Sequence, residues 1–252
     1  MWGKPTAVTA AVAAAVLVIA GVALAAGKWE VVRVGSLEVK YNGGFSPKVL
    51  SKKKPTPISF NVAAEIKSLD PAEPHPPALR KLVIEGDKHA SIDVKGIPIC
   101  KSSKLQSISS AGARKACGPA LIGSGKTDVE VKFPEQPAVL AHSELLAFNG
   151  GRRGDLTTLF IHAYITRPIV SAVVTTVKVK KIHKGRYGLE SVATVPKIAG
   201  GSGSPTFFTL TLNKGIIKAT CTDGHLDAHG TATFSDNTVA SGTVIRPCTP
   251  KG

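Results

Sequence analysis

Two aspartates and two histidines recur at every second position near the C-terminal end of the chain. They are Asp223, His225, Asp227 and His229. In an extended strand these side chains would share one face, where they could bind zinc or another transition metal. Polar alternation is also typical of any exposed strand face, and no H-E-x-x-H motif exists because Leu226 occupies the glutamate position. We therefore interpret the segment as an exposed strand and predict no metal site.

The segment 120–127, Ala-Leu-Ile-Gly-Ser-Gly-Lys-Thr, matches a relaxed phosphate-binding loop in which alanine replaces the first glycine. Such a loop needs a strand before it and a helix after it, so that helix N-terminal amides face the phosphates. Here Cys117-Gly118-Pro119 precedes the loop, and the apolar alternation of residues 129–133 predicts a strand after it. We predict no nucleotide site and no cofactor.

Motifs for nucleophilic catalysis are also missing. The Gly-Ser-rich segment 200–204 is not G-x-S-x-G, because Ser204 stands in place of the final glycine. The 7 histidines and 17 acidic residues are scattered, so only folding could bring an acid–base pair together. The sequence predicts that the protein is not an enzyme. A secreted hydrolase with a composite active site is the alternative.

The best binding candidate in the sequence is a group of five basic residues. They are Lys178, Lys180, Lys181, Lys184 and Arg186. Lys178 and Lys180 alternate with valines, which places both charges on the outer face of a strand, where they could contact phosphate or carboxylate groups. A protected edge strand has the same appearance. Tyr187 is the only aromatic residue beside the group, so we expect no nucleic acid partner.

We expect residues 1–25 to be a targeting segment. Lys4 precedes an apolar run whose only polar member is Thr9, and the run ends in Ala23-Leu24-Ala25. This order is typical of a secretory signal peptide cleaved after Ala25. An uncleaved N-terminal anchor is the alternative, because about 20 apolar residues can span a bilayer. In either case residues 26–252 are predicted to form one exported domain, secreted or on the extracellular face of the membrane.

All four cysteines lie in this exported part, and four cysteines allow three pairings. The two local pairs, Cys100 with Cys117 and Cys221 with Cys248, close the shortest loops. The second pair also brackets a predicted β-hairpin. The sequence contains no C-x-x-C pair, so the cysteine spacing does not indicate a zinc site. We predict two structural disulfides at these local pairs, as is typical of exported proteins.

Short runs of alternating apolar and polar residues predict an all-β sandwich of about a dozen short strands. The clearest run has five apolar residues on one face, Ile58, Phe60, Val62, Ala64 and Ile66. Asn42-Gly43-Gly44 and Asn149-Gly150-Gly151 predict turns. Residues 102–116 lack this alternation and predict a short helix after a cap at Ser102 or Ser103.

The charge of the exported part is strongly positive. Residues 26–252 hold 31 of the 32 lysines and arginines and all 17 acidic residues, which gives 31 − 17 = +14. Such a charge favours association with anionic polymers or membrane surfaces. It also keeps a β protein soluble and discourages sheet edges from pairing.

The chain resembles a loose group of secreted bacterial β-rich proteins without an established function. The resemblance rests on four segments, 41–47, 97–100, 117–125 and the hairpin between Cys221 and Cys248. It implies export and two local disulfides, and it transfers no functional residues. The sequence as a whole favours a non-enzymatic secreted or cell-surface sandwich that associates with an anionic cell-wall polymer or membrane surface. A purely structural envelope protein is a further alternative.

Overall fold

The computed structural model describes residues 28–252, and the predicted targeting segment 1–25 lies outside the described residues. In chain order the strands are β1 (Glu30–Val34), β2 (Leu37–Ser46), β3 (Val49–Ser51), β4 (Thr56–Ser68), β5 (Leu79–Asp87), β6 (Ala90–Ile92), β7 (Leu121–Val131), β8 (Val139–Arg153), β9 (Leu156–Ile165), β10 (Ser171–Lys184), β11 (Tyr187–Thr194), β12 (Gly203–Ala219), β13 (His225–Phe234), β14 (Val239–Pro247) and β15 (Thr249–Lys251). The helix α1 spans Ser110–Cys117, and the 3₁₀ turns η1, η2 and η3 span Ser102–Lys104, Gly118–Ala120 and Ala199–Gly201.

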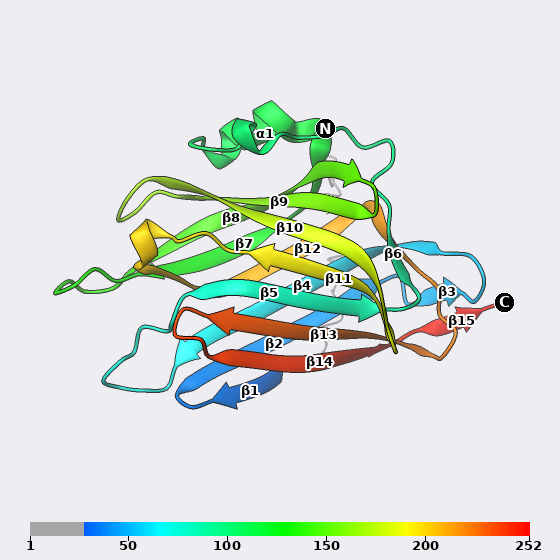
Figure 1. The fold of residues 1–252 in the computed structure, drawn as a ribbon, viewed down its shortest axis with the longest axis horizontal. Coiled ribbons are helices and arrows are strands. Elements are labelled where there is room, and N and C mark those ends of the chain that lie inside the picture. Colours follow the sequence, from blue (N-terminus) through cyan, green and yellow to red (C-terminus); the bar gives the residue numbers. More distant parts are fainter. Residues whose placement is uncertain (1–27) are drawn as a thin grey trace, which may run out of the picture.

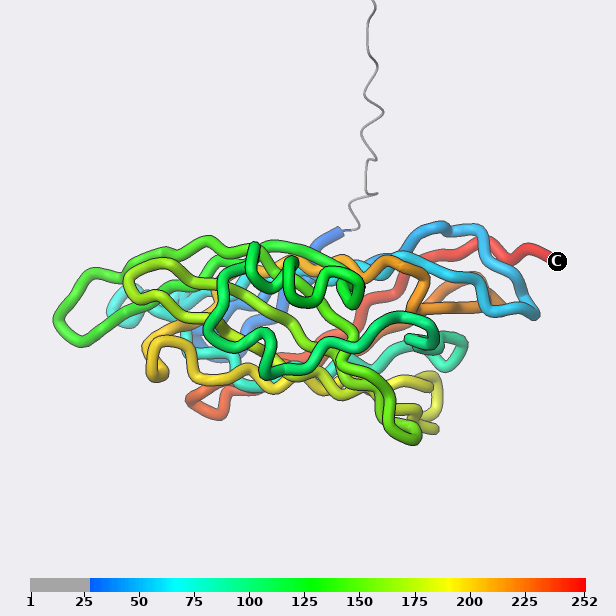
Figure 2. The backbone as a smooth tube through the Cα atoms, turned by 90° about the horizontal axis from the view of Figure 1, so that it is seen from above, coloured from blue at the N-terminus to red at the C-terminus, as the bar shows by residue number. Residues whose placement is uncertain are grey.

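Thirteen of these strands form one antiparallel sheet, in the order β1-β2-β4-β12-β7-β8-β9-β10-β11-β5-β13-β14, with β6 paired to β12. The sheet is nearly closed and flattened, so that β10, β11, β5, β13 and β14 lie in front of β7, β12, β4 and β2 (Figures 1 and 2). The short strands β15 and β3 pair separately, in parallel. The predicted all-β sandwich is confirmed, and its two layers are the two halves of a single sheet.

The two ends of the sheet are joined by side chains. Arg246 on β14 donates from Nε to the Gly43 carbonyl oxygen (2.8 Å) and from Nη2 to the Lys28 carbonyl oxygen (3.1 Å). The Tyr41 hydroxyl packs directly over Gly242, where a Cβ atom would overlap it. The seam between β14 and the first two strands is therefore closed by one guanidinium group and one phenol.

The apolar alternation of β4 is confirmed as a core pattern. Ile58 and Ile66 at its two ends are almost fully buried, and Phe60 and Val62 between them are half-buried. All four face the space between the layers. The buried side chains gather into five separate clusters. These clusters do not merge into one core, and a hollow remains between the two layers.

The two predicted glycine turns are wrong, because both segments lie inside strands. Gly44 belongs to β2, where an added Cβ would lie 3.1 Å from Asn61 Oδ1. Gly150 belongs to β8, where an added Cβ would lie 2.7 Å from the Phe160 ring and 3.0 Å from the Thr158 carbonyl oxygen. These glycines allow neighbouring strands to approach closely instead of reversing the chain.

The predicted short helix is confirmed, but it begins later than expected. Ser109 is the N-cap residue, and its side chain accepts a hydrogen bond from the Gly112 amide (3.1 Å). A disulfide between Cys100 and Cys117 joins the start of this segment to the end of α1. The segment lies on the outer side of β8 and β9, as Figure 1 shows, and its apolar side chains are buried there.

His162 on β9 is fully buried beneath this helical segment. Its Nε2 donates to the Ile108 carbonyl oxygen (3.0 Å), and its Nδ1 has no hydrogen-bond partner among the described residues. Burial lowers the pKa of His162 below its ordinary value, and the hydrogen bond to Ile108 only partly opposes this. The imidazole is therefore held in its neutral form.

This burial predicts a pH-dependent stability. Because the pKa of His162 is lower in the folded than in the unfolded chain, the unfolded chain takes up the proton first as the pH falls. Burial of neutral His162 therefore contributes fully to stability only above the histidine pKa of the unfolded chain, about 6.5. As the pH falls below that value, the free energy of unfolding decreases by at most about 1.4 kcal/mol per pH unit. In denaturant titrations, the stability difference between wild type and His162→Gln should shrink between pH 7.5 and pH 5. The matched variant His183→Gln, at an exposed position, should keep the wild-type dependence. Parallel curves for wild type and His162→Gln would contradict this role.

Candidate functional site

A cavity of about 370 Å³ lies between the two layers of the sandwich. Its wall is almost entirely aliphatic and aromatic. Representative lining residues are Phe60, Val62 and Leu210 from one layer and Ile84, Val177 and Leu189 from the other. Small-molecule sites in proteins have volumes of about 300–1,000 Å³ and mainly apolar walls. The cavity therefore has the size and chemistry of a site for an apolar ligand.

One end of the cavity is positively charged. Arg246 lines it, and Lys48 lies next to it with its Nζ 3.9 Å from the centre of the Phe45 ring. Burial and then the charge of Arg246 lower the pKa of Lys48. The guanidinium of Arg246 bonds to uncharged oxygens, and neither cation has an ion-pair partner within residues 28–252.

The two carboxylates at the same end already have partners. Asp227 forms an ion pair with Arg186, whose Nη1 lies 2.9 Å from Oδ2. Asp87 accepts from the backbone amides of His89 (2.8 Å) and Asp227 (3.1 Å). Within residues 28–252 Asp87 has no ion-pair partner, so the charges without a counter-ion at this end are two cations and one carboxylate. The excess of positive charge suits an anionic group on a ligand.

A second pocket, of about 380 Å³, is polar and lies at the opposite end of the sheet. The 69–78 loop, the turns after β1 and β13, and the start of β12 line it. Within it, Ser204 Oγ lies 3.1 Å from His75 Nε2, and His75 Nδ1 lies 2.6 Å from Glu130 Oε1. Ser204 also donates to the Pro76 carbonyl oxygen (2.7 Å). Ser204, His75 and Glu130 are thus linked by a chain of side-chain hydrogen bonds.

Long-range strand pairing brings these three residues together. Ser204 on β12 stands directly opposite Glu130 on β7, and His75 reaches them from the loop between β4 and β5. His75 is 129 positions before Ser204 and 55 before Glu130. In the sequence, Ser204 stands out only as the residue that breaks the G-x-S-x-G pattern, and it is not a candidate nucleophile there. No pattern of neighbouring residues in the sequence could have indicated this arrangement, because the pairing of β7 with β12 brings Ser204 and Glu130 together.

The five basic residues identified in the sequence lie along β10 and the turn to β11, and all are exposed. Three of them are paired: Lys180 with Glu190 (2.9 Å), Lys184 with Glu85 (2.8 Å) and Arg186 with Asp227 (2.9 Å). Lys178 and Lys181 have no ion-pair partner in the described part of the chain. The edge-strand interpretation is wrong, because β10 is hydrogen-bonded to β9 on one side and to β11 on the other.

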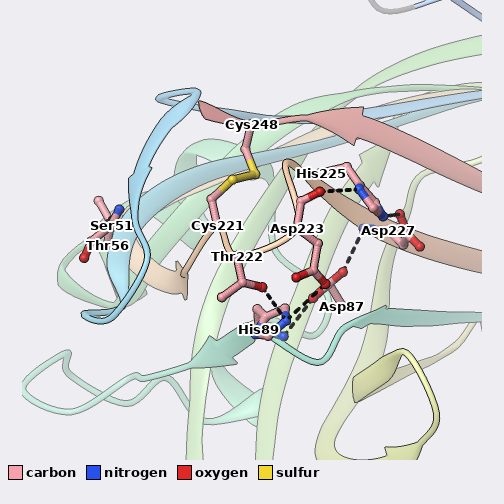
Figure 3. Close-up of a disulfide and its surroundings, with 10 residues drawn as sticks. All are labelled: Ser51, Thr56, Asp87, His89, Cys221, Thr222, Asp223, His225, Asp227 and Cys248. Atoms are coloured by element: carbon pink, nitrogen blue, oxygen red, sulfur yellow. Dashed lines mark hydrogen bonds and ion pairs between the residues drawn. A yellow bond between two sulfur atoms is a disulfide. The ribbon is translucent and has the colours of Figure 1, made fainter. Parts of the chain in front are cut away.

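The alternating Asp/His segment is largely a strand, as predicted, but it is not an exposed edge: β13 is paired with β5 and β14, and Asp227 is buried. His225, Asp227 and His229 belong to β13, and Asp223 lies in the loop before it, near Asp87 and His89 below the Cys221–Cys248 disulfide (Figure 3). Their partners are Arg186 for Asp227 and the Thr243 hydroxyl for His229 (2.9 Å). Across residues 28–252, no group of three or more His, Cys, Asp or Glu side chains is arranged to hold a metal ion.

In the segment that matches a phosphate loop, Ala120 ends the turn η2 and residues 121–127 belong to β7, which is paired on both sides, with β12 and β8. The strand predicted from residues 129–133 begins earlier than expected, at Leu121, so it includes the matching segment itself. An added Cβ at Gly123 or Gly125 would overlap the carbonyl oxygens of Thr211 or Thr209 on β12. The glycines therefore serve close strand packing.

Both predicted disulfides are confirmed, Cys100 with Cys117 and Cys221 with Cys248. Disulfides of this kind form and persist in oxidising compartments. Among the helices of residues 28–252, none has the length and apolarity needed to cross a membrane. The chain matches no family model, no curated protein and no solved structure.

Proposed function

We propose that the protein is an exported carrier that holds a long-chain fatty acid in the cavity between its two layers. The observation that carries the proposal is the cavity of about 370 Å³ with an almost wholly apolar wall. A filled interior would contribute more to stability, since lining side chains lose packing contacts where a void remains. A ligand that buries its apolar chain there would restore those contacts.

The charged end of the cavity supports an acid as the ligand. Arg246 and Lys48 would attract the carboxylate, while the acyl chain would extend along the apolar wall between Val62 and Leu189. The net charge of +14 over residues 26–252 supports encounter with an anionic membrane surface of the cell envelope. The disulfides support a site of action outside the reducing cytoplasm.

A cavity-filling variant tests the site. Val62 faces the cavity beside Leu210, so Val62→Phe should occupy the space and weaken binding of a fluorescent fatty acid by at least about tenfold, equal to about 1.4 kcal/mol. Thermal unfolding should show no loss of stability. The control Val83→Phe, on the outer face of β5, should bind normally. If Val62→Phe bound the fluorescent fatty acid with wild-type affinity, the fatty acid would not occupy this cavity, and the proposal would be contradicted.

A second comparison tests the charged end. Arg246→Gln and Lys48→Gln should each weaken binding of the fatty acid about tenfold, equal to about 1.4 kcal/mol. The matching fatty alcohol should bind both variants as it binds wild type. Because Arg246 also closes the seam, Lys48→Gln provides the cleaner measurement if Arg246→Gln loses stability. Equal effects on the acid and the alcohol would show that these cations do not recognise a carboxylate.

A further inference from the structure

We infer that Ser204, His75 and Glu130 form a catalytic triad that hydrolyses an uncharged carboxylic ester in the polar pocket. This activity is independent of the proposed fatty-acid site. Ser204 faces the polar pocket, whereas Pro205, the next residue, lines the apolar cavity. The two sites therefore lie on different sides of β12 and can be tested separately.

The three side chains have the order of contacts that acyl-transfer chemistry needs. A nucleophile must reach a base, and the base must be oriented by a third group. Ser204 Oγ is 3.1 Å from His75 Nε2, and His75 Nδ1 is 2.6 Å from Glu130 Oε1. A proton on Nδ1 would be held by the carboxylate, which leaves the lone pair of Nε2 facing the serine.

The serine proton has two acceptors within reach. Ser204 Oγ is 2.7 Å from the Pro76 carbonyl oxygen and 3.1 Å from His75 Nε2. A hydroxyl carries one proton, and rotation about the Cβ–Oγ bond redirects it from one acceptor to the other. The heavy atoms already lie where general-base catalysis requires them, so activation needs no movement of the strand or the loop.

The chemical steps balance with water as the only co-reactant. Ser204 Oγ bonds to the ester carbonyl carbon while its proton passes to His75 Nε2, and the bond from that carbon to the alkoxy oxygen breaks. The departing oxygen takes the proton from Nε2 and leaves as an alcohol. Water then attacks the acyl-serine, giving its proton to Nε2, and the serine oxygen leaves with that proton. The products are one alcohol and one carboxylic acid.

The wall of the pocket favours an uncharged substrate. Asp70, Glu73 and Asp236 line it together with Ser36 and His75, so anionic groups would be repelled. Ser204 is almost fully buried, whereas the His75 side chain is 18 % exposed. A substrate would enter past the imidazole and meet the serine at the inner wall.

A covalent probe tests the inference on the unaltered protein. A fluorophosphonate reacts with an activated serine, and peptide mass spectrometry should find the adduct on Ser204. Hydrolysis of p-nitrophenyl acetate should fall by at least about 100-fold in Ser204→Ala and in His75→Gln. The control Ser103→Ala, at an exposed serine of η1 that lines neither pocket, should keep wild-type rates.

Glu130 acts through His75 and is a positioning residue. Glu130→Gln should lower hydrolysis at least about tenfold, and Glu130→Asp should partly restore it, because a shorter carboxylate can still orient the imidazole. If Glu130 had only a structural role, hydrolysis would not decrease in the order wild type, Glu130→Asp, Glu130→Gln. No adduct, an adduct on another serine, or hydrolysis unchanged in Ser204→Ala would overturn the inference. Because the fluorophosphonate labelling uses the wild-type protein, it tests the role of Ser204 even if a variant fails to fold.

Discussion

Replacing Gly125 by alanine should lower the free energy of unfolding by about 3 kcal/mol or more, because it overfills a strand contact. Gly125 lies on β7 opposite Leu210 of β12, and an added Cβ would overlap the Thr209 carbonyl oxygen. That oxygen belongs to a backbone, so it cannot move aside as a side chain can. The two strands would have to separate in the middle of the sheet. Urea denaturation followed by far-UV circular dichroism would measure the loss.

The matched control for this experiment is Gly230→Ala on β13. Gly230 is also a strand glycine, but an added Cβ there would meet no atom within 4 Å. Gly230→Ala should change stability by less than about 1 kcal/mol, as a substitution without overlap does. Equal losses in the two variants would show that glycine flexibility, and not the approach of β12, governs Gly125.

Removing the disulfide between Cys221 and Cys248 should cost roughly 3–4 kcal/mol in the double variant Cys221→Ser/Cys248→Ser. The two cysteines are 27 positions apart, so the bond restricts a loop of moderate length in the unfolded chain. Both are buried beside Phe45 and Leu50, and the Cys221 amide donates to the Ser51 carbonyl oxygen (3.0 Å). The bond therefore also holds the β3–β15 corner against the main sheet.

The second disulfide gives the comparison for this prediction. Cys100 and Cys117 are only 17 positions apart, so their double serine variant should lose slightly less, about 3 kcal/mol. Denaturant midpoints of both variants and of wild type, with and without reductant, would order the three proteins. A larger loss at Cys100–Cys117 would mean that burial of α1 over His162, and not loop length, dominates.

Local patterns in the sequence predicted much of the fold. The alternation from Ile58 to Ile66 predicted β4 and its inward face, because strand side chains alternate whatever the partner strand is. The cysteine spacing predicted both bonds, because short loops are easiest to close. The helix was placed but its start was not, since Ser102, Ser103 and Ser109 are all suitable caps and only packing chooses between them.

What local patterns missed depends on contacts between distant strands. Asn-Gly-Gly reads as a turn, yet Gly44 and Gly150 allow Asn61 and Phe160 to approach from neighbouring strands. Ser204 became a candidate nucleophile only because β12 pairs with β7 and places it beside Glu130. The interior cavity is also not visible in the sequence. Strand alternation indicates which side chains face inward but not how far apart the two layers stand.

Closure of the sheet requires nearly the whole chain to have left the ribosome. Arg246 bonds to the Lys28 carbonyl oxygen, 218 positions earlier, and β14 is the last strand of the main sheet. A nascent chain that ends before β14 leaves β13 as an unpaired sheet edge and lacks the seam to the first two strands. Strand pairings between residues so far apart in the sequence form slowly, and until they form, aggregation-prone apolar surface stays exposed. The protein should therefore need a chaperone, or an extended state during transport, until its final strand is available.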